Sequence, residues 1–262
     1  MGSSTNRYHA LVEKIFFDGY SKKKRLIPFS REEFVSAAKA LRIKLPKNIG
    51  DVIYSIRYRS SLPARVLETQ PAGSEWIIEG VGRGEYAFKL VKMSRVVPRA
   101  DLKTIKIPDA TPEIIRTYAQ TDEQALLAIV RYNRLVDIFL GIATYSLQNH
   151  WRTTIGSGVQ IEIDEIYIGI DKHGCHYVIP VQAKGGTDQI GVVQTLQDLT
   201  CCREKFPGLA TRAISAQFMA GDIIAMFELT VEDDQVKVVE ERHYRLVPAA
   251  EVDAKAVRAY RT

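Results

Sequence analysis

Two acids and an amide–lysine pair lie on neighbouring stretches of strand-like sequence. Glu162 and Asp164 belong to the first stretch, Gln182 and Lys184 to the second, and a turn at 172–174 separates them. Residues two apart in a strand share a face, so a hairpin of these stretches would bring the acids close to the amide and the amine. Carboxylate and amide oxygens are hard ligands that suit Mg²⁺, and a nearby ammonium can hold or activate a water. The spacing therefore predicts a site that cleaves phosphodiester bonds.

This arrangement resembles the PD-(D/E)XK nuclease superfamily, the fold of most type II restriction endonucleases. The match is Asp164 followed, after a hairpin-sized spacer, by Gln182-Ala183-Lys184. It departs from the commonest pattern because Ile163 replaces the proline before Asp164 and because Gln182 replaces an acid. The resemblance covers approximately residues 120 to 230 and implies an α/β (α+β) fold, a restriction-endonuclease-like mixed sheet flanked by helices.

The resemblance also implies a role for each residue. Asp164 would bridge Mg²⁺, while the side-chain oxygen of Gln182 and the backbone carbonyl of Ala183 would complete the protein ligands. Lys184 would position the attacking water and stabilise the developing charge. Glu162, on the face of Asp164, would hold a metal directly or through water. Because glutamine is neutral, we expect a modest metal affinity.

The apolar positions of the first stretch change phase at Asp164-Glu165. A shift of one residue swaps the faces of a strand, and an inserted bulge residue is the usual remedy. We therefore predict a bulge, a bend or a change of neighbouring strand at this point, which would turn the Asp164 carboxylate toward Lys184. The apolar residues are Val159, Ile161 and Ile163 at odd positions and Ile166, Ile168 and Ile170 at even ones.

Charge is distributed unevenly along the 262 residues. Residues 1–108 hold 21 lysines and arginines against 10 aspartates and glutamates, a net charge of +11, whereas residues 109–262 hold 15 against 21, a net charge of −6. A basic half joined to an acidic half suggests a DNA-binding part and a part with another task. We accordingly predict an N-terminal DNA-binding domain with a linker at 1–108 and a nuclease domain at 109–262.

The N-terminal half has the pattern of a winged helix-turn-helix. Ser30 with Glu33 is a capping box for a helix to about residue 42, and a second helix is expected from about residue 48 to 59. Strands at 75–79 and 85–91 form a hairpin with an arginine at its tip. In such a module the second helix enters the major groove of double-stranded DNA and the wing touches the backbone. The residues predicted to contact DNA are Lys47, Asn48, Arg57, Arg59 and Arg83.

The remaining elements follow from turn residues and periodicity. Residues 98–110 are interpreted as a linker, Thr111-Pro112 starts a short helix, and a longer helix runs from 121 to about 140. We interpret 145–152 as an extension of that helical region. Later elements are a helix at 189–205 and strands near 212–219, 223–231 and 236–245. The order of the nuclease core that the resemblance implies is helix, three strands, helix, strand.

These observations favour a Mg²⁺-dependent endonuclease acting on duplex DNA, most simply a bacterial, cytoplasmic type II restriction enzyme that works as a homodimer. No apolar run approaches the roughly 20 residues of a membrane span, and three cysteines do not form a disulfide framework. The alternatives are a nicking, repair or junction nuclease, and a winged-helix transcription regulator without enzymatic activity. No motif indicates whether unmodified or cytosine-modified DNA is cut.

Overall fold

The structure is a computed structural model in which the chain divides into two compact units. The first comprises Met1–Met93 with Thr154–Val159, and the second Ser94–Thr153 with Gln160–Thr262. The first unit holds 17 lysines and arginines against 9 aspartates and glutamates, a net charge of +8. The residues that the structure describes are 4–46, 49–58, 62–92, 96–118, 123–156, 158–185, 190–232, 235–252 and 254–260.

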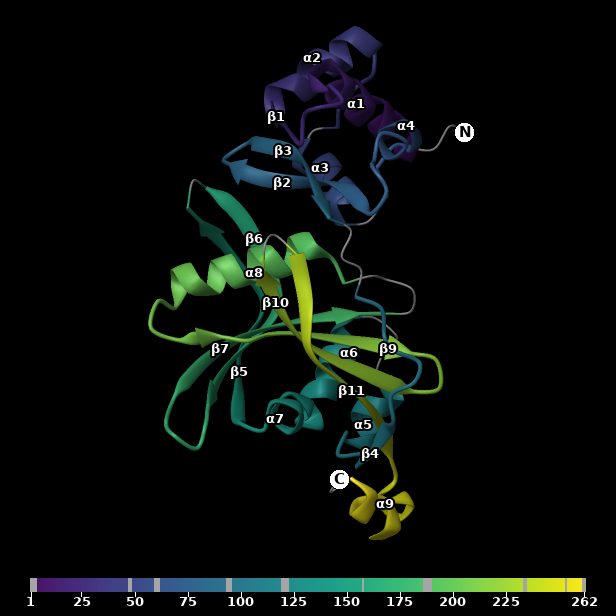
Figure 1. The fold of residues 1–262 in the computed structure, drawn as a ribbon, viewed down its shortest axis with the longest axis vertical. Helices are drawn as coiled ribbons and strands as arrows, with labels where there is room; N and C mark the ends of the chain where they lie inside the picture. Colours follow the sequence, from purple (N-terminus) through teal and green to yellow (C-terminus); the bar gives the residue numbers. More distant parts are fainter. Residues whose placement is uncertain are drawn as a thin grey trace. The chain divides into compact units, whose positions relative to one another are not determined.

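The first unit consists of helices packed on a small antiparallel sheet of order β1-β3-β2 (Figure 1). The predicted pair of helices and the predicted hairpin are present, whereas α1 and β1 are additions that the sequence pattern did not indicate. The elements are α1 (Ser4–Gly19), β1 (Leu26–Ser30), α2 (Arg31–Leu41), α3 (Ile49–Tyr58), α4 (Ala64–Leu67), β2 (Ser74–Gly82) and β3 (Glu85–Lys92).

The core of this unit is aromatic. Phe16 of α1 makes edge-on contacts with Trp76 of β2 and Phe88 of β3, and Phe34 of α2 is buried beside them. The predicted capping box between Ser30 and Glu33 starts α2. Leu41, the last residue of α2, is 40% exposed, because the helix ends there in a left-handed turn.

The second unit is a curled mixed sheet with helices on both faces (Figure 1). Its strand order is β4-β11-β10-β9-β7-β6-β5, and β8 pairs with β7. The elements are β4 (Thr104–Pro108), α5 (Glu113–Tyr118), α6 (Glu123–Tyr132), α7 (Leu135–Leu140), β5 (Ala143–Ile155), β6 (Val159–Ile170), β7 (His176–Lys184), α8 (Val192–Lys205), β8 (Ala210–Thr211), β9 (Ala213–Met219), β10 (Ile223–Glu232), β11 (Gln235–Val247), the 3-10 turn η1 (Ala249–Glu251) and α9 (Ala254–Ala259).

Two separate apolar layers fix the helices to this sheet. Leu127 of α6 and Leu135 of α7 pack with Val181 of β7 on one face. Leu199 of α8 packs with Phe227 of β10 on the other. Because these residues are almost completely removed from water, each contributes roughly 1.5–3 kcal/mol to stability. The sheet is therefore a central layer whose middle strands, β7 and β9, are covered on both sides.

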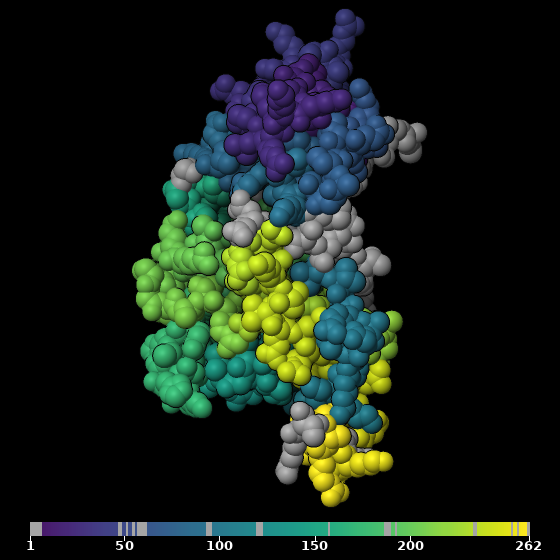
Figure 2. Space-filling model, in the orientation of Figure 1, coloured from purple at the N-terminus to yellow at the C-terminus, as the bar shows by residue number. Residues whose placement is uncertain are grey.

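Two sequence expectations about this unit are wrong. The proposed linker at 98–110 contains β4, which pairs in parallel with β11; Figure 2 shows the blue segment that includes β4 beside the yellow residues of β11. Residues 145–152 are not helical but belong to β5, because Gly141 ends α7 in the left-handed conformation. The strand after Gly141 is also rich in threonine and aromatic residues, which favour strands.

The expected helix from 121 to 140 is two helices rather than one. The break falls at Asn133-Arg134, where Arg134 is in the left-handed region with φ 49°. The buried Asn133 side chain accepts a hydrogen bond from the backbone N–H of Ala110 at 2.7 Å and donates one to the hydroxyl of Thr111 at 2.7 Å. These bonds tie the start of the α5 segment to the end of α6.

The three cysteines differ in exposure, and this gives a test of the fold. Cys175 is exposed, whereas Cys201 and Cys202 of α8 are buried. Burial raises the pKa of Cys201 to about 11 and that of Cys202 further still. At about pH 8 we expect one thiol of the folded protein to react rapidly with a disulfide reagent, and all three after denaturation, because only the thiolate reacts. Rapid reaction of a second thiol in the native protein would contradict the packing of α8 described above.

Candidate functional site

Strands β6 and β7 pair along only part of their length. The ladder between them runs from Glu165↔Val181 to Ile170↔His176. Beyond Val181, β7 pairs in parallel with β9 as far as Lys184. The two strands thus separate at Asp164, and we call this place, formed by Asp164 and residues 181–184, the β6–β7 fork.

The pairing of β6 with β7 begins only at Glu165, while β6 itself continues as one strand from Val159 to Ile170. The expected swap of faces is wrong. Tyr167, at an odd position, is buried like Ile161 and Ile163, whereas Ile170, at an even position, is 39% exposed. No residue is inserted, and Ile166 is buried on the opposite face of the continuous strand.

The Asp164 carboxylate closes the fork. Its Oδ2 accepts a hydrogen bond from the backbone N–H of Ala183 at 3.2 Å. Ala183 is fully buried, so its N–H needs a partner once the β6–β7 ladder has ended. The side chain of Asp164 thus takes the place of the missing ladder bond, and its second oxygen is left for other partners.

Lys184 reaches across the fork toward α6. Its ammonium lies 3.3 Å from a carboxylate oxygen of Glu123, at the start of that helix. The Lys184 side chain is only 14% exposed, whereas that of Glu123 is 41% exposed. Burial raises the pKa of the Asp164 carboxyl, and the charge of Lys184 partly opposes this shift. Asp164, Lys184 and Glu123 therefore form one group of interacting charges.

Gln182 faces α8 and is almost completely buried, with 1% exposure. Its amide nitrogen donates to the hydroxyl oxygen of Thr195 at 3.2 Å and to Oδ2 of Asp198 at 3.1 Å. Both partners are buried residues of α8. Among the described residues, neither the amide oxygen of Gln182 nor Oδ1 of Asp198 has a hydrogen-bond partner.

Glu162 is engaged elsewhere. Its carboxylate lies 3.3 Å from a ring nitrogen of His150 and 3.2 Å from the guanidinium of Arg152, both on β5. His150 has a positive φ of 45°, a conformation that L side chains adopt at some cost in strain. The structure thus directs Glu162 toward the edge strand, although its charge still contributes to raising the pKa of Asp164.

Burial dominates the electrostatics of the fork. It raises the pKa of Asp164, while the Lys184 ammonium and the Ala183 N–H act in the opposite direction. Burial also raises the pKa of Asp198 well above its usual value, and the charge of Asp164 adds to this, whereas Gln182 and Lys184 lower it. Shifted carboxyls that share a lysine in one place are typical of functional sites, although structural ion pairs shift pKa values too.

The donor atoms of the fork suit a hard cation. Asp164, Glu123 and the amide of Gln182 offer oxygen atoms, which Mg²⁺ prefers, and the Gln182 oxygen is a buried acceptor in need of a partner. Within the described part of the chain, no cluster of three or more histidine, cysteine, aspartate or glutamate side chains is placed to hold a metal ion. The donor set is compatible with Mg²⁺ and contains few acids.

Most of the residues predicted to contact DNA cannot be placed. Lys47, Asn48 and Arg59 lie outside the described residues, as does the side chain of Arg57. Arg83 is exposed in the turn between β2 and β3, as the sequence pattern predicted. The neighbouring Gly84 carbonyl accepts a hydrogen bond from the backbone N–H of Arg31, which holds this turn against the start of α2.

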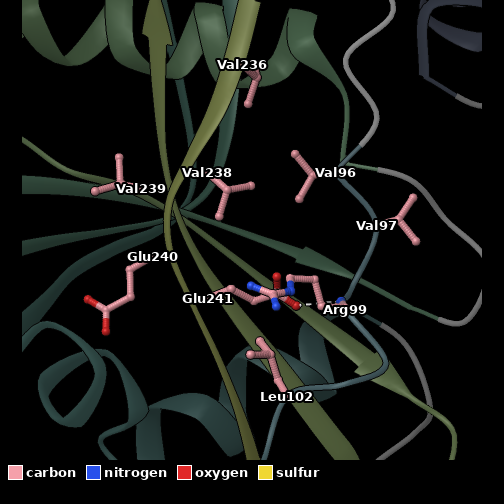
Figure 3. Close-up of a pocket in the computed structure, with 9 residues that line it drawn as sticks. All are labelled: Val96, Val97, Arg99, Leu102, Val236, Val238, Val239, Glu240 and Glu241. Atoms are coloured by element: carbon pink, nitrogen blue, oxygen red, sulfur yellow. Dashed lines mark hydrogen bonds between the residues drawn. The ribbon is translucent and has the colours of Figure 1, made fainter.

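A separate cavity of about 400 Å³ lies beside β11. Figure 3 shows that valines from β11 and from the segment before β4 line it, and that the backbone N–H of Arg99 donates to Glu241. None of the residues of the β6–β7 fork borders this cavity. No described helix is long and apolar enough to cross a lipid bilayer.

Sequence reasoning missed Glu123 and Asp198. Glu123 lies in the first turn of a helix, where acids are common for reasons of helix stability alone. Asp198 left a clearer signal, since it is next to the buried Leu199 and three residues after the buried Thr195. An acid on the apolar face of a helix indicates a buried partner, which here is Gln182.

Comparisons of the chain with models of protein families, with curated protein sequences and with solved structures found no match.

The contacts of Gln182 change what we expect from its replacement by the acid that is commoner in the family pattern. Gln182→Glu removes both N–H donors and places a second buried carboxyl against Asp198. We predict a loss of roughly 1–3 kcal/mol in metal-free stability, measured by denaturant unfolding in EDTA. The loss should grow from about pH 5 to about pH 8, because a carboxyl whose pKa rises on folding keeps its proton in the folded state but loses it on unfolding.

The exposed Gln160 provides a matched control. Gln160→Glu makes the same chemical change on β6 at a solvated position, and should alter stability by less than about 0.5 kcal/mol. Equal stabilities of Gln182→Glu and Gln160→Glu would show that the amide hydrogens of Gln182 contribute nothing to the fold.

Proposed function

We propose that the protein is a Mg²⁺-dependent endonuclease of the PD-(D/E)XK kind that hydrolyses phosphodiester bonds in duplex DNA. The observation that carries the proposal is the β6–β7 fork, where the Asp164 carboxylate bonds the Ala183 N–H, next to Lys184, at the point where two strands separate. The order of α6 and α7, then β5, β6 and β7, then α8 and β9 also agrees with the order that the resemblance implies.

Each residue of the fork has a task in this chemistry. Bound Mg²⁺ would lower the pKa of a water and neutralise charge on the phosphate. Asp164, with one oxygen held by the Ala183 N–H, would present its other oxygen as a ligand, together with the Gln182 amide oxygen and the Ala183 carbonyl. Lys184 would hold the attacking water and stabilise the developing negative charge, and Glu123 would keep the lysine ammonium in place. Glu162 would contribute through its charge rather than by direct contact.

The basic first unit supports a role in holding DNA. Its net charge is +8, and the run Lys22-Lys23-Lys24-Arg25 is exposed in the turn before β1. Exposed lysines and arginines bind phosphates with little dependence on sequence. Helices α2 and α3 followed by the β2–β3 hairpin are the parts expected of a winged helix-turn-helix, with α3 as its DNA-reading helix. A type II restriction enzyme, active as a homodimer on unmodified or cytosine-modified DNA, is the specific form that we propose.

Substitution of the fork tests the catalytic part. Asp164→Ala and Lys184→Ala should each reduce plasmid cleavage by at least about 100-fold, while DNA binding in Ca²⁺ stays close to that of the wild type. EDTA should abolish cleavage by every variant. Lys172→Ala removes one exposed lysine from the β6–β7 turn and serves as the control for charge. Full activity of Asp164→Ala or Lys184→Ala would contradict the assignment.

Digestion of methylated and unmethylated plasmids resolves the specific form. Discrete fragments would support a restriction enzyme, and their dependence on methylation would identify the DNA that it cuts. Nicked circles or a continuous smear would indicate a repair or junction nuclease instead. Binding without any Mg²⁺-dependent cleavage would favour a transcription regulator.

Arg83 tests the DNA-binding part. Arg83→Ala in the full chain should weaken binding to duplex DNA and reduce the slope of log affinity against log salt by about one, because one phosphate contact is lost. Fluorescence anisotropy over a range of salt concentrations measures both quantities. Lys172→Ala again controls for net charge, and an equal effect of the two substitutions would argue against a specific contact by the β2–β3 turn.

A further inference from the structure

The two ends of the Gln182 amide have unequal surroundings. Both hydrogens of the amide nitrogen are used, one toward Thr195 and one toward Asp198. The amide oxygen, although buried, has no partner within the described part of the chain. Rotation of a side-chain amide by 180° exchanges its oxygen and its nitrogen with little change in shape. The orientation of the Gln182 amide is therefore determined by the groups around it.

Thr195 favours the orientation in which the amide nitrogen of Gln182 faces α8. Its hydroxyl donates its single hydrogen to the Gly191 carbonyl at 3.2 Å, so only its lone pairs are left for Gln182. A turned-over amide would put its oxygen against those lone pairs and lose the bond. Asp198 acts in the same direction, because Oδ2 accepts the second N–H at 3.1 Å.

We propose that Asp198 and Thr195 are positioning residues that hold the Gln182 amide with its oxygen presented as a metal ligand in the β6–β7 fork. The inference rests on the proposed function. Mg²⁺ binds oxygen and is repelled by N–H groups, so the turned-over amide would block the site rather than complete it. Glutamine can replace the usual acid here only because α8 fixes its orientation.

A purely structural role accounts less well for the same contacts. The Gln182 amide oxygen and Oδ1 of Asp198 both lack partners among the described residues, so the contacts with α8 leave these acceptors open to a ligand. The charges of Asp164 and Lys184 both act on Asp198, which places this pair close to the fork. A bound cation would provide the partner that the Gln182 oxygen lacks.

Metal affinity in the full-length protein tests the inference without DNA. Titration with Mn²⁺, followed by the electron paramagnetic resonance of the free ion, gives the dissociation constant directly. Asp198→Ala should raise that constant at least about 10-fold, the usual effect of removing a group that orients a ligand. Thr195→Val, which is nearly isosteric, should raise it in the same direction. The Mg²⁺ concentration for half-maximal cleavage should shift in parallel, with DNA affinity in Ca²⁺ unchanged.

Conservative variants separate orientation from charge and from folding. Asp198→Asn keeps an oxygen that accepts the Gln182 N–H, and Thr195→Ser keeps the hydroxyl, so both should recover most of the affinity. Ser215→Ala is the matched control, since Ser215 pairs with Gln182 in the β7–β9 ladder but does not bond its amide. Should Asp198→Ala fail to fold, Thr195→Val with Thr195→Ser decides the question.

The outcomes for the inference and for the proposed function are distinct. A wild type that binds Mn²⁺ and cuts DNA, with Asp198→Ala and Thr195→Val binding the ion equally well, overturns the inference alone. A loss in Asp198→Asn as large as in Asp198→Ala also overturns it, because the carboxylate would then act by charge. A wild type that binds Mn²⁺ through Gln182 yet cuts no DNA overturns the proposed function and leaves the inference standing.

Discussion

The hydrogen bond from the Ala183 N–H to the Asp164 carboxylate is the interaction on which the fork depends. A buried backbone donor must have a partner, and the β6–β7 ladder no longer supplies one beyond Val181. By accepting this bond at 3.2 Å, Asp164 allows two strands to separate without leaving an unpaired N–H in the core. The separation gives Lys184 its path to α6. In the proposed function the same carboxylate would serve both structure and chemistry, with one oxygen bound to the backbone and the other free for a metal ion.

The next residue fixes β6 in place. Glu165 is completely buried and accepts a hydrogen bond from the Arg131 guanidinium of α6 at 2.8 Å. A carboxylate removed from water needs such donors, so this contact holds β6 to the helix that also carries Glu123. Adjacent acids thus point to opposite faces of one strand and differ in role. Asp164 is placed in the fork because Glu165 is anchored on the other side.

The sequence predicted the strands and the residues of the fork better than the partners of those residues. Alternating and continuous apolar stretches identified β6 and β7, and the phase change located the point where they separate. Residues 145–152 were wrongly predicted to extend the preceding helix, because Gly141, which ends that helix, was not recognised as its C-terminal residue. Glu123 and Asp198 could not be found from spacing, since they approach Lys184 and Gln182 only through the packing of α6 and α8 on opposite faces of the sheet.

Gln182 and Asp198 depend on each other, and this explains the departure from the commoner acid. The buried space between β7 and α8 already contains one carboxyl, whose pKa is raised well above its usual value. A second carboxyl there would have to share a proton with the first, because two charges at such a distance cannot both ionise at low cost. An amide avoids this conflict, since it donates to the carboxyl at one end and offers an oxygen at the other. The neutral residue is thus the one that fits beside an acid on α8, and under the proposed function its oriented oxygen would take the place of a charged ligand.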